Sequence, residues 1–236
     1  MEYDGKRIRH EQKYFINKNV YDTLRLRLPY VTERDANMKN EDGYLISSLY
    51  FDDMYGSAWE QKKAGIRFRK KFRLRCYDRQ DFYIRLECKQ KYDAYIAKSG
   101  AVISRQDYDR LLGGDYAFLA EREEEVCRQL FAYHMTRRLK PVVNVEYLRE
   151  AYVLPQGNVR ITFDKEISAS VGDFDMFSEQ FTTGRMLPED ICVLEVKFDD
   201  FIPNHVLSIL KTAMTDHCAV SKYVMCREGK RRMKAL

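Results

Sequence analysis

Alternation of apolar and polar residues is the dominant pattern of this chain, and it predicts several β-strands. Successive side chains of a strand point to opposite faces, so a period of two separates one face from the other. The alternation predicts strands over residues 7–16, 44–51, 67–77, 82–91, 142–153, 158–166 and 191–198.

Helical patterns lie between some of these strands. Asn17 or Asn19 can cap a helix that stops at Pro29, and Ser104 opens another that stops at Gly113. Further helical patterns cover a short segment around Trp59, residues 116–138 and the stretch after Pro203. Many strands with intervening helices, but without a regular βαβ alternation, predict the α+β class with an antiparallel sheet.

The strand over residues 67–77 is unusual because one of its faces is almost entirely cationic. That face carries Arg67, Arg69, Lys71, Arg73, Arg75 and Tyr77, and the other carries Phe68, Lys70, Phe72, Leu74 and Cys76. A single charged strand face is most often the wet side of an antiparallel sheet. Arginine, however, favours planar recognition of oxyanions such as phosphate, so a bound polyanion is the alternative.

The other strands favour the polyanion, because they carry charged faces of the same kind. Together these faces hold Arg9, Glu11, Lys13, Arg67, Arg69, Lys71, Arg73, Arg75, Arg85, Glu87, Lys89, Lys91, Arg160, Asp164, Glu195 and Lys197. Several strands with one basic face and one apolar face predict a closed antiparallel β-barrel tunnel with a charged lumen, flanked by helices. Such a lumen would hold a polyphosphate, and its few carboxylates would hold a divalent cation that bridges phosphate oxygens.

Composition sets the outer limits of this interpretation. With 236 residues and a net charge of +5, the chain is long enough for one sizeable domain, which we expect to span residues 1–236 with a basic, frayed tail from about residue 227. The first residues lack the pattern of a signal peptide, and no apolar run approaches the ~20 residues that span a bilayer. We therefore expect a cytoplasmic protein without a transmembrane segment.

Several other site types are excluded by their missing motifs. No pair among the six cysteines has the spacing of a zinc site, and Cys76, Cys88 and Cys192 fall on apolar strand faces, which predicts buried, reduced thiols. The four histidines form no metal-spaced cluster. There is no P-loop, no dinucleotide-binding glycine motif and no nucleophile elbow.

Seven short motifs, in order along nearly the whole chain, resemble one known family. They are Arg9-x-Glu11-x-Lys13-Tyr14, Ser48-Leu49-Tyr50-Phe51-Asp52, Arg69-x-Lys71-x-Arg73-x-Arg75-x-Tyr77, Leu86-Glu87-x-Lys89, Val159-Arg160-Ile161-Thr162-Phe163-Asp164, Leu194-Glu195-x-Lys197-Phe198 and Ser221-Lys222-Tyr223. Together they resemble the catalytic domain of the vacuolar transporter chaperone (VTC) family. That domain is a polyphosphate polymerase of the CYTH-like triphosphate tunnel metalloenzymes, whose fold is an antiparallel β-barrel tunnel.

The resemblance implies roles for individual residues. The nucleotide triphosphate would be gripped by Lys13, Arg73, Arg75, Lys89 and Lys98, and from the opposite wall by Arg149 and Arg160. Glu195 would ligate manganese or magnesium, and Lys222 would engage the phosphate chain from a C-terminal helical segment. Glu11 and Glu87 are further metal candidates, for which a salt bridge within the lumen is an equal alternative. The remaining substrate-binding candidates are Arg9, Arg67, Arg69, Lys71, Lys91 and Lys197.

The resemblance predicts an enzyme that transfers the γ-phosphoryl of ATP to phosphate or to a growing polyphosphate. Related triphosphatases carry Glu-x-Glu-x-Lys on the first strand, whereas this chain has Arg9 at the first glutamate position, which favours polymerisation over hydrolysis. Two alternatives stay open. One is an inorganic or nucleoside triphosphatase in the same tunnel, and the other is a non-catalytic module that binds polyphosphate or RNA. Carboxylates among the cations argue against the binding module, and we expect no specific nucleic-acid partner. The sequence does not indicate an oligomeric state.

Overall fold

The computed structural model describes residues 2–3, 6–7, 9–92, 95–170, 173–179, 181–215, 217 and 220–233. The chain forms two compact units, each assembled from separate stretches of sequence. Unit 1 comprises Met1–Leu45, Tyr147–Ile167 and Arg185–Ser221, and unit 2 comprises Ile46–Glu146, Ser168–Gly184 and Lys222–Leu236. The prediction of a single domain over residues 1–236 stays a prediction.

Strands form the sheets of both units, and the strand pairs with a described register are antiparallel. The strands are β1 (Glu2–Tyr3), β2 (Lys6–Arg7), β3 (His10–Asn17), β4 (Glu33–Arg34), β5 (Tyr44–Asp52), β6 (Phe68–Tyr77), β7 (Ile84–Tyr92), β8 (Tyr95–Ile103), β9 (Lys140–Leu154), β10 (Val159–Ser170), β11 (Thr183–Arg185) and β12 (Ile191–Phe198). The main sheet has the order β3-β12-β10-β9-β5-β6-β7-β8, with β4 on β9 and β11 on β10, and β1 pairs with β2 in a separate ribbon.

The described strand order is open, whereas the sequence predicted a closed barrel. The two ends of the order are β3 and β8. Strand β3 pairs with β12 along one edge, and Tyr14 of β3 also makes an isolated antiparallel bridge to His217. The α+β class, with an antiparallel sheet flanked by helices, is confirmed.

The helices are α1 (Lys18–Arg27), η1 (Leu28–Tyr30), α2 (Ser57–Lys63), α3 (Arg105–Leu112), η2 (Ala117–Ala120), α4 (Glu125–Arg137), η3 (Gln156–Asn158), α5 (Asn204–Leu210) and α6 (Lys222–Met233). Asn17 caps α1 by accepting from the Val20 amide, and Ser104 caps α3 by accepting from the Asp107 amide, as the sequence predicted. Among the described residues, no helix is both long and apolar enough to cross a bilayer.

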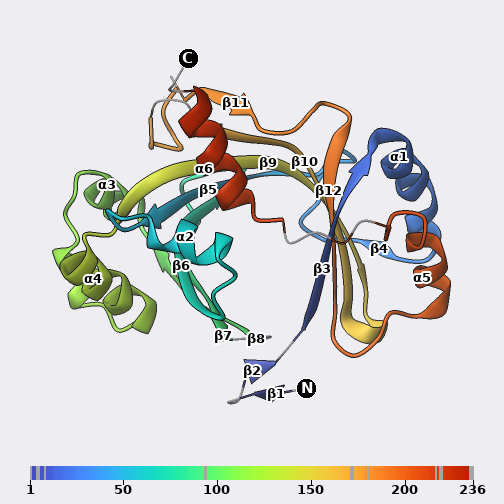
Figure 1. Ribbon diagram of the computed structural model, residues 1–236, viewed down its shortest axis with the longest axis horizontal. Coiled ribbons are helices and arrows are strands. Elements are labelled where there is room, and N and C mark those ends of the chain that lie inside the picture. Colours follow the sequence, from blue (N-terminus) through green and yellow to red (C-terminus); the bar gives the residue numbers. More distant parts are fainter. Residues whose placement is uncertain are drawn as a thin grey trace. The chain divides into compact units, whose positions relative to one another are not determined.

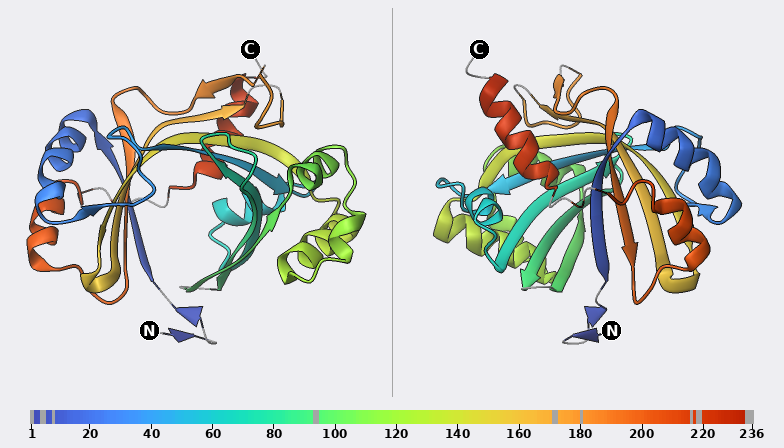
Figure 2. Two further views of the ribbon diagram at one scale, coloured as in Figure 1. Left: turned by 180° about the vertical axis from the view of Figure 1, so that it is seen from behind. Right: turned by 45° about the vertical axis from the view of Figure 1, so that its right-hand side comes forward.

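Each unit has its own apolar core between helices and one face of the strands. In unit 1, α1 and α5 cover β3, β10 and β12, and the core includes Leu24, Phe163, Leu194 and Leu210 (Figure 1). In unit 2, α3 and α4 cover β6, β7 and β8. Figure 2 shows the same elements in two further views. The even-numbered side chains of β6 and β7 supply that core, so strand parity places the odd-numbered charged side chains on the opposite face.

Four sequence-based expectations differ from the structure. The helix predicted over residues 116–138 is two segments in the structure, η2 and α4, and between them the Arg122 guanidinium donates to the Val102 carbonyl of β8. The basic tail is helical as far as Met233, and only Lys234 to Leu236 lie outside the described residues. Phe82 was predicted to begin the strand over residues 82–91 but lies in the turn before β7 and is 78% exposed. Arg67 precedes β6 rather than lying in it.

The cysteine prediction is confirmed where the structure describes it. Cys76, Cys88, Cys127, Cys192 and Cys226 are buried, free thiols. Burial raises the pKa of Cys88 to about 11, so this thiol stays protonated and inert at neutral pH. Cys218 lies outside the described residues.

Candidate functional site: two charged sheet faces

The strands of unit 1 place four predicted residues in two antiparallel cross-strand pairs. Glu195 of β12 lies directly across from Lys13 of β3, and Lys197 lies directly across from Glu11. On its other edge β12 pairs with β10, which sets Arg160 across from Lys197. We call the following set the charged face of unit 1: Glu11, Lys13, Arg149, Arg160, Asp164, Glu195 and Lys197.

Two carboxylates of this face share one lysine. The Lys13 Nζ lies 2.7 Å from Glu11 Oε1 and 3.5 Å from Glu195 Oε2, and the other Glu195 oxygen contacts Lys197 Nζ. Burial alone would lower the pKa of Lys13, but Glu195 and Glu11 raise it well above its ordinary value. Lys13 is therefore charged at neutral pH, and Glu195 lies between the side chains of Lys13 and Lys197.

Arg149 forms the most deeply buried ion pair of unit 1. Its Nε lies 2.6 Å from Asp164 Oδ1 and its Nη2 lies 2.8 Å from Oδ2, a bidentate geometry. Burial alone would lower the pKa of Arg149, but Asp164 raises it. Gly43, with φ of +98°, lies so close that a Cβ there would sit 2.1 Å from the Arg149 carbonyl oxygen. A glycine is therefore needed for the backbone of Arg149 to occupy this position.

Two other predicted phosphate ligands of unit 1 are held by carboxylates. Arg160 donates to Asp35, 2.8 Å away, and to the Tyr44 hydroxyl, 3.2 Å away. Arg9 lies 3.3 Å from Asp199. Asp35 and Asp199 were not predictable as partners from the sequence, because both lie in irregular segments with no periodic signal.

Unit 2 presents a second charged face on β6, β7 and β8. Its members are Arg69, Lys71, Arg73, Arg75, Arg85, Glu87, Lys89, Lys91 and Lys98. The register places Lys71 across from Lys89, and Lys89 across from Lys98, so three ammonium groups form one row over three adjacent strands. Like charges directly opposite one another destabilise a sheet, so this row favours an anionic occupant.

One carboxylate neutralises the middle of this face. Glu87 lies across from Arg73, with its Oε2 2.7 Å from Arg73 Nε. Burial alone would raise the pKa of Glu87, but Arg73 and Arg75 lower it to about 2. Arg73 also donates to the Tyr50 hydroxyl at 3.0 Å, so this guanidinium is fixed in place before any ligand binds.

Helix α6 begins over the charged face of unit 2. The Tyr223 ring lies 5.2 Å from the Tyr50 ring and 5.1 Å from Lys71 Nζ. The buried Asp52 carboxylate accepts from the Tyr223 hydroxyl and from Arg227, and it also accepts from the amides at the start of α2. This network, which we call the Asp52 clamp, fixes the first turn of α6 and with it Lys222. Asp52 belongs to one of the seven motifs, but its role in this network was not predicted from the sequence.

The carboxylates of unit 1 could hold a divalent cation only if oxygens of a bound ligand complete its coordination. Among the described residues, no three His, Cys, Asp or Glu side chains gather as a preformed metal site. Glu11 and Glu195 nevertheless converge on one lysine, and magnesium-type ions commonly use one or two carboxylates together with substrate phosphates. These two residues fit such an ion completed by phosphate oxygens, whereas Glu87 is engaged by Arg73.

The matching family model decides the family. The VTC domain model matches residues 8–228, which is nearly the whole chain. The chain belongs to the VTC domain family. The resemblance carried by the seven motifs is thereby confirmed. Among curated proteins, none matches this VTC domain at a significant level.

Solved structures show a similar fold. A candidate adenylate cyclase of Bacillus halodurans is 16% identical with a TM-score of 0.54, and the match covers 91% of this chain and 94% of that one. A protein of Pyrococcus horikoshii OT3 is 12% identical with a TM-score of 0.47, covering 94% of this chain and 99% of that one. At such identities, the first similarity shows the fold of this VTC domain and nothing more specific.

Proposed function

We propose that this VTC domain is a metal-dependent polyphosphate polymerase. In the reaction, a terminal oxygen of phosphate or polyphosphate attacks the γ-phosphorus of ATP. The bond from the γ-phosphorus to the bridging oxygen breaks, and ADP leaves with that oxygen. Such a reaction requires mainly positioning and neutralisation of charge from the protein.

The row of Lys71, Lys89 and Lys98 is the observation that carries this proposal. Three lysines side by side repel one another, and phosphates that lie along the row would reduce this repulsion. Arg73, Arg75 and Lys222 would hold the triphosphate next to this row, and Arg69 and Lys91 would extend it toward the growing chain. In unit 1, Lys13, Arg149, Arg160 and Lys197 would bind further phosphate oxygens.

Glu195 and Glu11 would hold manganese or magnesium, with Glu87 as a third candidate. A bound cation would neutralise charge on the phosphate oxygens. Lys13 would then release Glu11 and Glu195 to the cation and turn to the phosphates. Arg9, which replaces the first glutamate of the triphosphatase motif, is held by Asp199 and leaves one carboxylate fewer for metal.

The test follows three products at once. The pure protein is incubated with ATP and manganese, and ADP, free phosphate and acid-stable phosphate polymer are measured together. We expect ADP and polymer with little free phosphate, and short added polyphosphate should remove any initial lag by acting as a primer. Free phosphate released one-for-one with ADP, without polymer at any primer level, would instead establish the triphosphatase. Binding without turnover would establish a polyanion-binding module.

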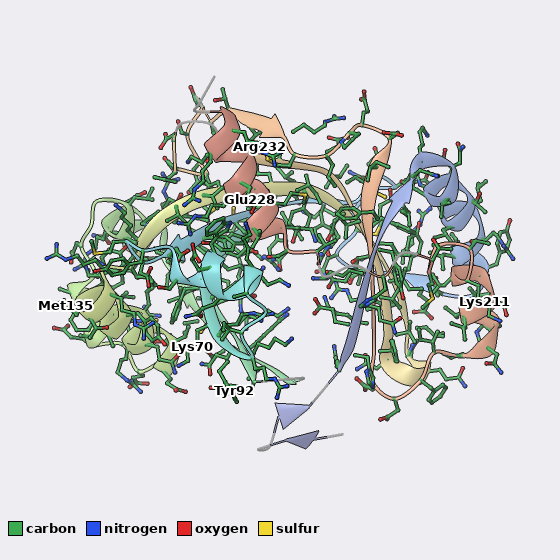
Figure 3. All side chains as sticks on the ribbon, viewed as in Figure 1. Lys70, Tyr92, Met135, Lys211, Glu228 and Arg232 are labelled. Atoms are coloured by element: carbon green, nitrogen blue, oxygen red, sulfur yellow. The ribbon has the colours of Figure 1, made fainter. Side chains whose placement is uncertain are left out.

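Charge reversal then tests the proposed path of the chain. Arg69→Glu or Lys91→Glu should shorten the polymer more than it weakens ATP binding, because these residues would lie beyond the nucleotide. Lys211→Glu, in an exposed position after α5, serves as a control for the change in net charge (Figure 3). Equal shortening by Lys211→Glu would contradict a specific path.

A further inference from the structure

Unit 2 contains a cavity of about 230 Å³ beside the start of β6. Strand β5 pairs with β6 only from Tyr50 to Ile46, so beyond that point α2 and the C-terminal end of α4 lie beside β6 instead. The cavity is lined by the aromatic residues Phe68, Tyr92 and Tyr133 and the basic residues Lys70 and Arg137, and Arg69 and Lys91 also line it. We call the first five residues the basic aromatic pocket, and Figure 3 shows Lys70 and Tyr92 toward the same end of the strands.

Lys70 and Arg137 lie outside the charged faces and differ from most of the cations there. Lys13, Arg73 and Arg149 each contact a carboxylate, whereas Lys70 and Arg137, like Arg69 and Lys91 beside them, form no ion pair within the described part of the chain. Arg69 donates to the Ile66 carbonyl, and burial lowers its pKa. Four basic groups without an acidic partner around one cavity favour an anionic ligand.

The acidic residues in the wall are already occupied. Asp53 accepts from the amides of Tyr55 and Ser57, and Asp52 belongs to the clamp on α6. Neither carboxylate is directed at the four cations, so the cavity keeps a positive character.

The same cavity exposes aromatic surface. Phe68 is 64% exposed, and its ring packs edge-to-face with Tyr92 at 6.1 Å. Tyr133 is contacted by Lys70, 5.6 Å from the ring, and by Arg137 at 5.2 Å. An exposed phenylalanine face beside several cations suits a ligand that combines a planar ring with a phosphate.

We propose that the basic aromatic pocket binds a nucleoside monophosphate, with the base against Phe68 and the phosphate on Lys70 and Arg137. The cavity is slightly smaller than the ~300 Å³ at which typical ligand pockets begin, so it fits a base and one phosphate better than an extended triphosphate. This site lies on the helix-bearing side of the sheet, where Phe68, Lys70 and Phe72 point, and it does not depend on the proposed polymerase activity.

The experiment is calorimetric titration of the full chain with AMP, adenosine, inorganic phosphate and tripolyphosphate. We expect AMP to bind, and adenosine and phosphate each to bind at least tenfold more weakly, because each supplies half of the recognition. Lys70→Gln combined with Arg137→Gln should weaken AMP at least tenfold, and Phe68→Ala should do the same, whereas Arg128→Gln on the exposed side of α4 should not.

Two variants of the charged faces separate this site from the proposed active site. Lys13→Ala and Arg73→Ala should weaken the binding of tripolyphosphate and leave the affinity for AMP unchanged. The proposal is overturned if AMP does not bind, or if the affinity for AMP depends on Lys13 and Arg73 rather than on Lys70 and Arg137. It is also overturned if inorganic phosphate binds as tightly as AMP, since the aromatic part would then contribute nothing.

Discussion

At the scale of single residues, the carboxylates of the charged faces differ in how firmly their cationic partners hold them. Glu195 lies between two lysines on different strands and has an oxygen toward each. Glu87 is tied to an arginine that also holds Tyr50. A lysine can turn away from a carboxylate more easily than a fixed guanidinium can, so Glu195 is the better metal ligand and Glu87 the better structural anchor.

Glu195→Gln keeps the shape of the side chain and removes its charge. We expect the dependence of turnover on manganese or magnesium to be lost and the rate to fall about a hundredfold or more, comparable to losing one strong electrostatic stabiliser. Metal titrations of turnover measure this, and circular dichroism checks that the fold persists. Glu189→Gln on the exposed surface is the control. Full activity of the Glu195→Gln protein at saturating metal would remove Glu195 from the mechanism.

Glu87 should make unfolding sensitive to acid. Its pKa is lowered to about 2 in the folded protein, below the ~4.3 of an unfolded chain, so its contribution is complete above about pH 5 and is lost as the pH falls toward 2. The contribution is on the order of 2–3 kcal/mol at neutral pH. Urea unfolding from pH 6 to pH 3 should show a smaller loss of stability in Glu87→Gln than in the natural protein. Parallel pH profiles would contradict the assignment.

At the scale of elements, the position of α6 rests on the Asp52 clamp. One buried carboxylate connects the end of β5, the first turn of α2 and the first turn of α6. Arg227 also lies over the Trp59 ring of α2 at 5.9 Å, and Arg231 lies over it at 4.5 Å. The clamp thereby holds Lys222 in place without contacting substrate itself.

Tyr223→Phe removes only the hydroxyl that Asp52 accepts from. We expect the KM for ATP to rise several-fold, because Lys222 is less well fixed, and α6 to be cleaved faster in limited proteolysis. The hydrogen bond that is removed joins a hydroxyl to a charged carboxylate, and such bonds contribute about 1.5–3 kcal/mol to stability. Glu228→Gln, which removes an ion pair between α6 and Lys63 of α2 and leaves the Asp52 clamp intact, is the matched control. An unchanged KM with unchanged cleavage would contradict a positioning role.

At the scale of the whole molecule, the proposed function draws on charged residues of both units. Lys13 belongs to unit 1 and Arg75 to unit 2, and the proposed function predicts that each binds triphosphate. Lys13→Ala and Arg75→Ala should each weaken tripolyphosphate, and the double variant should depart from additivity by about 0.5–3 kcal/mol. Calorimetry of the four proteins measures this coupling. Additive effects would mean that the two charged faces bind separate ligands.

The fold was predictable where periodicity was strong and was missed where it was weak. Strands β5, β6, β7, β9, β10 and β12 were predicted within a few residues, because their alternation is long and rich in apolar residues. Strand β8 was missed, since Ser99, Gly100 and Ala101 give it little alternation, and pairing with β7 alone makes it a strand. Lys98 was named only through the resemblance, and β8 explains its place across from Lys89.

The sequence by itself determined which side chains share a face, because a strand fixes that parity locally and every segment carries it in its own order of residues. It therefore predicted the two-faced strands, the cationic row of β6 and the family. Only the tertiary structure decided which groups meet: Glu195 with Lys13, Arg149 with Asp164, Asp52 with Tyr223. Glu195 and Asp52 are far from their partners in sequence, and Arg149 and Asp164 lie on different strands. Their pairing depends on strand register and helix packing, which no local pattern encodes.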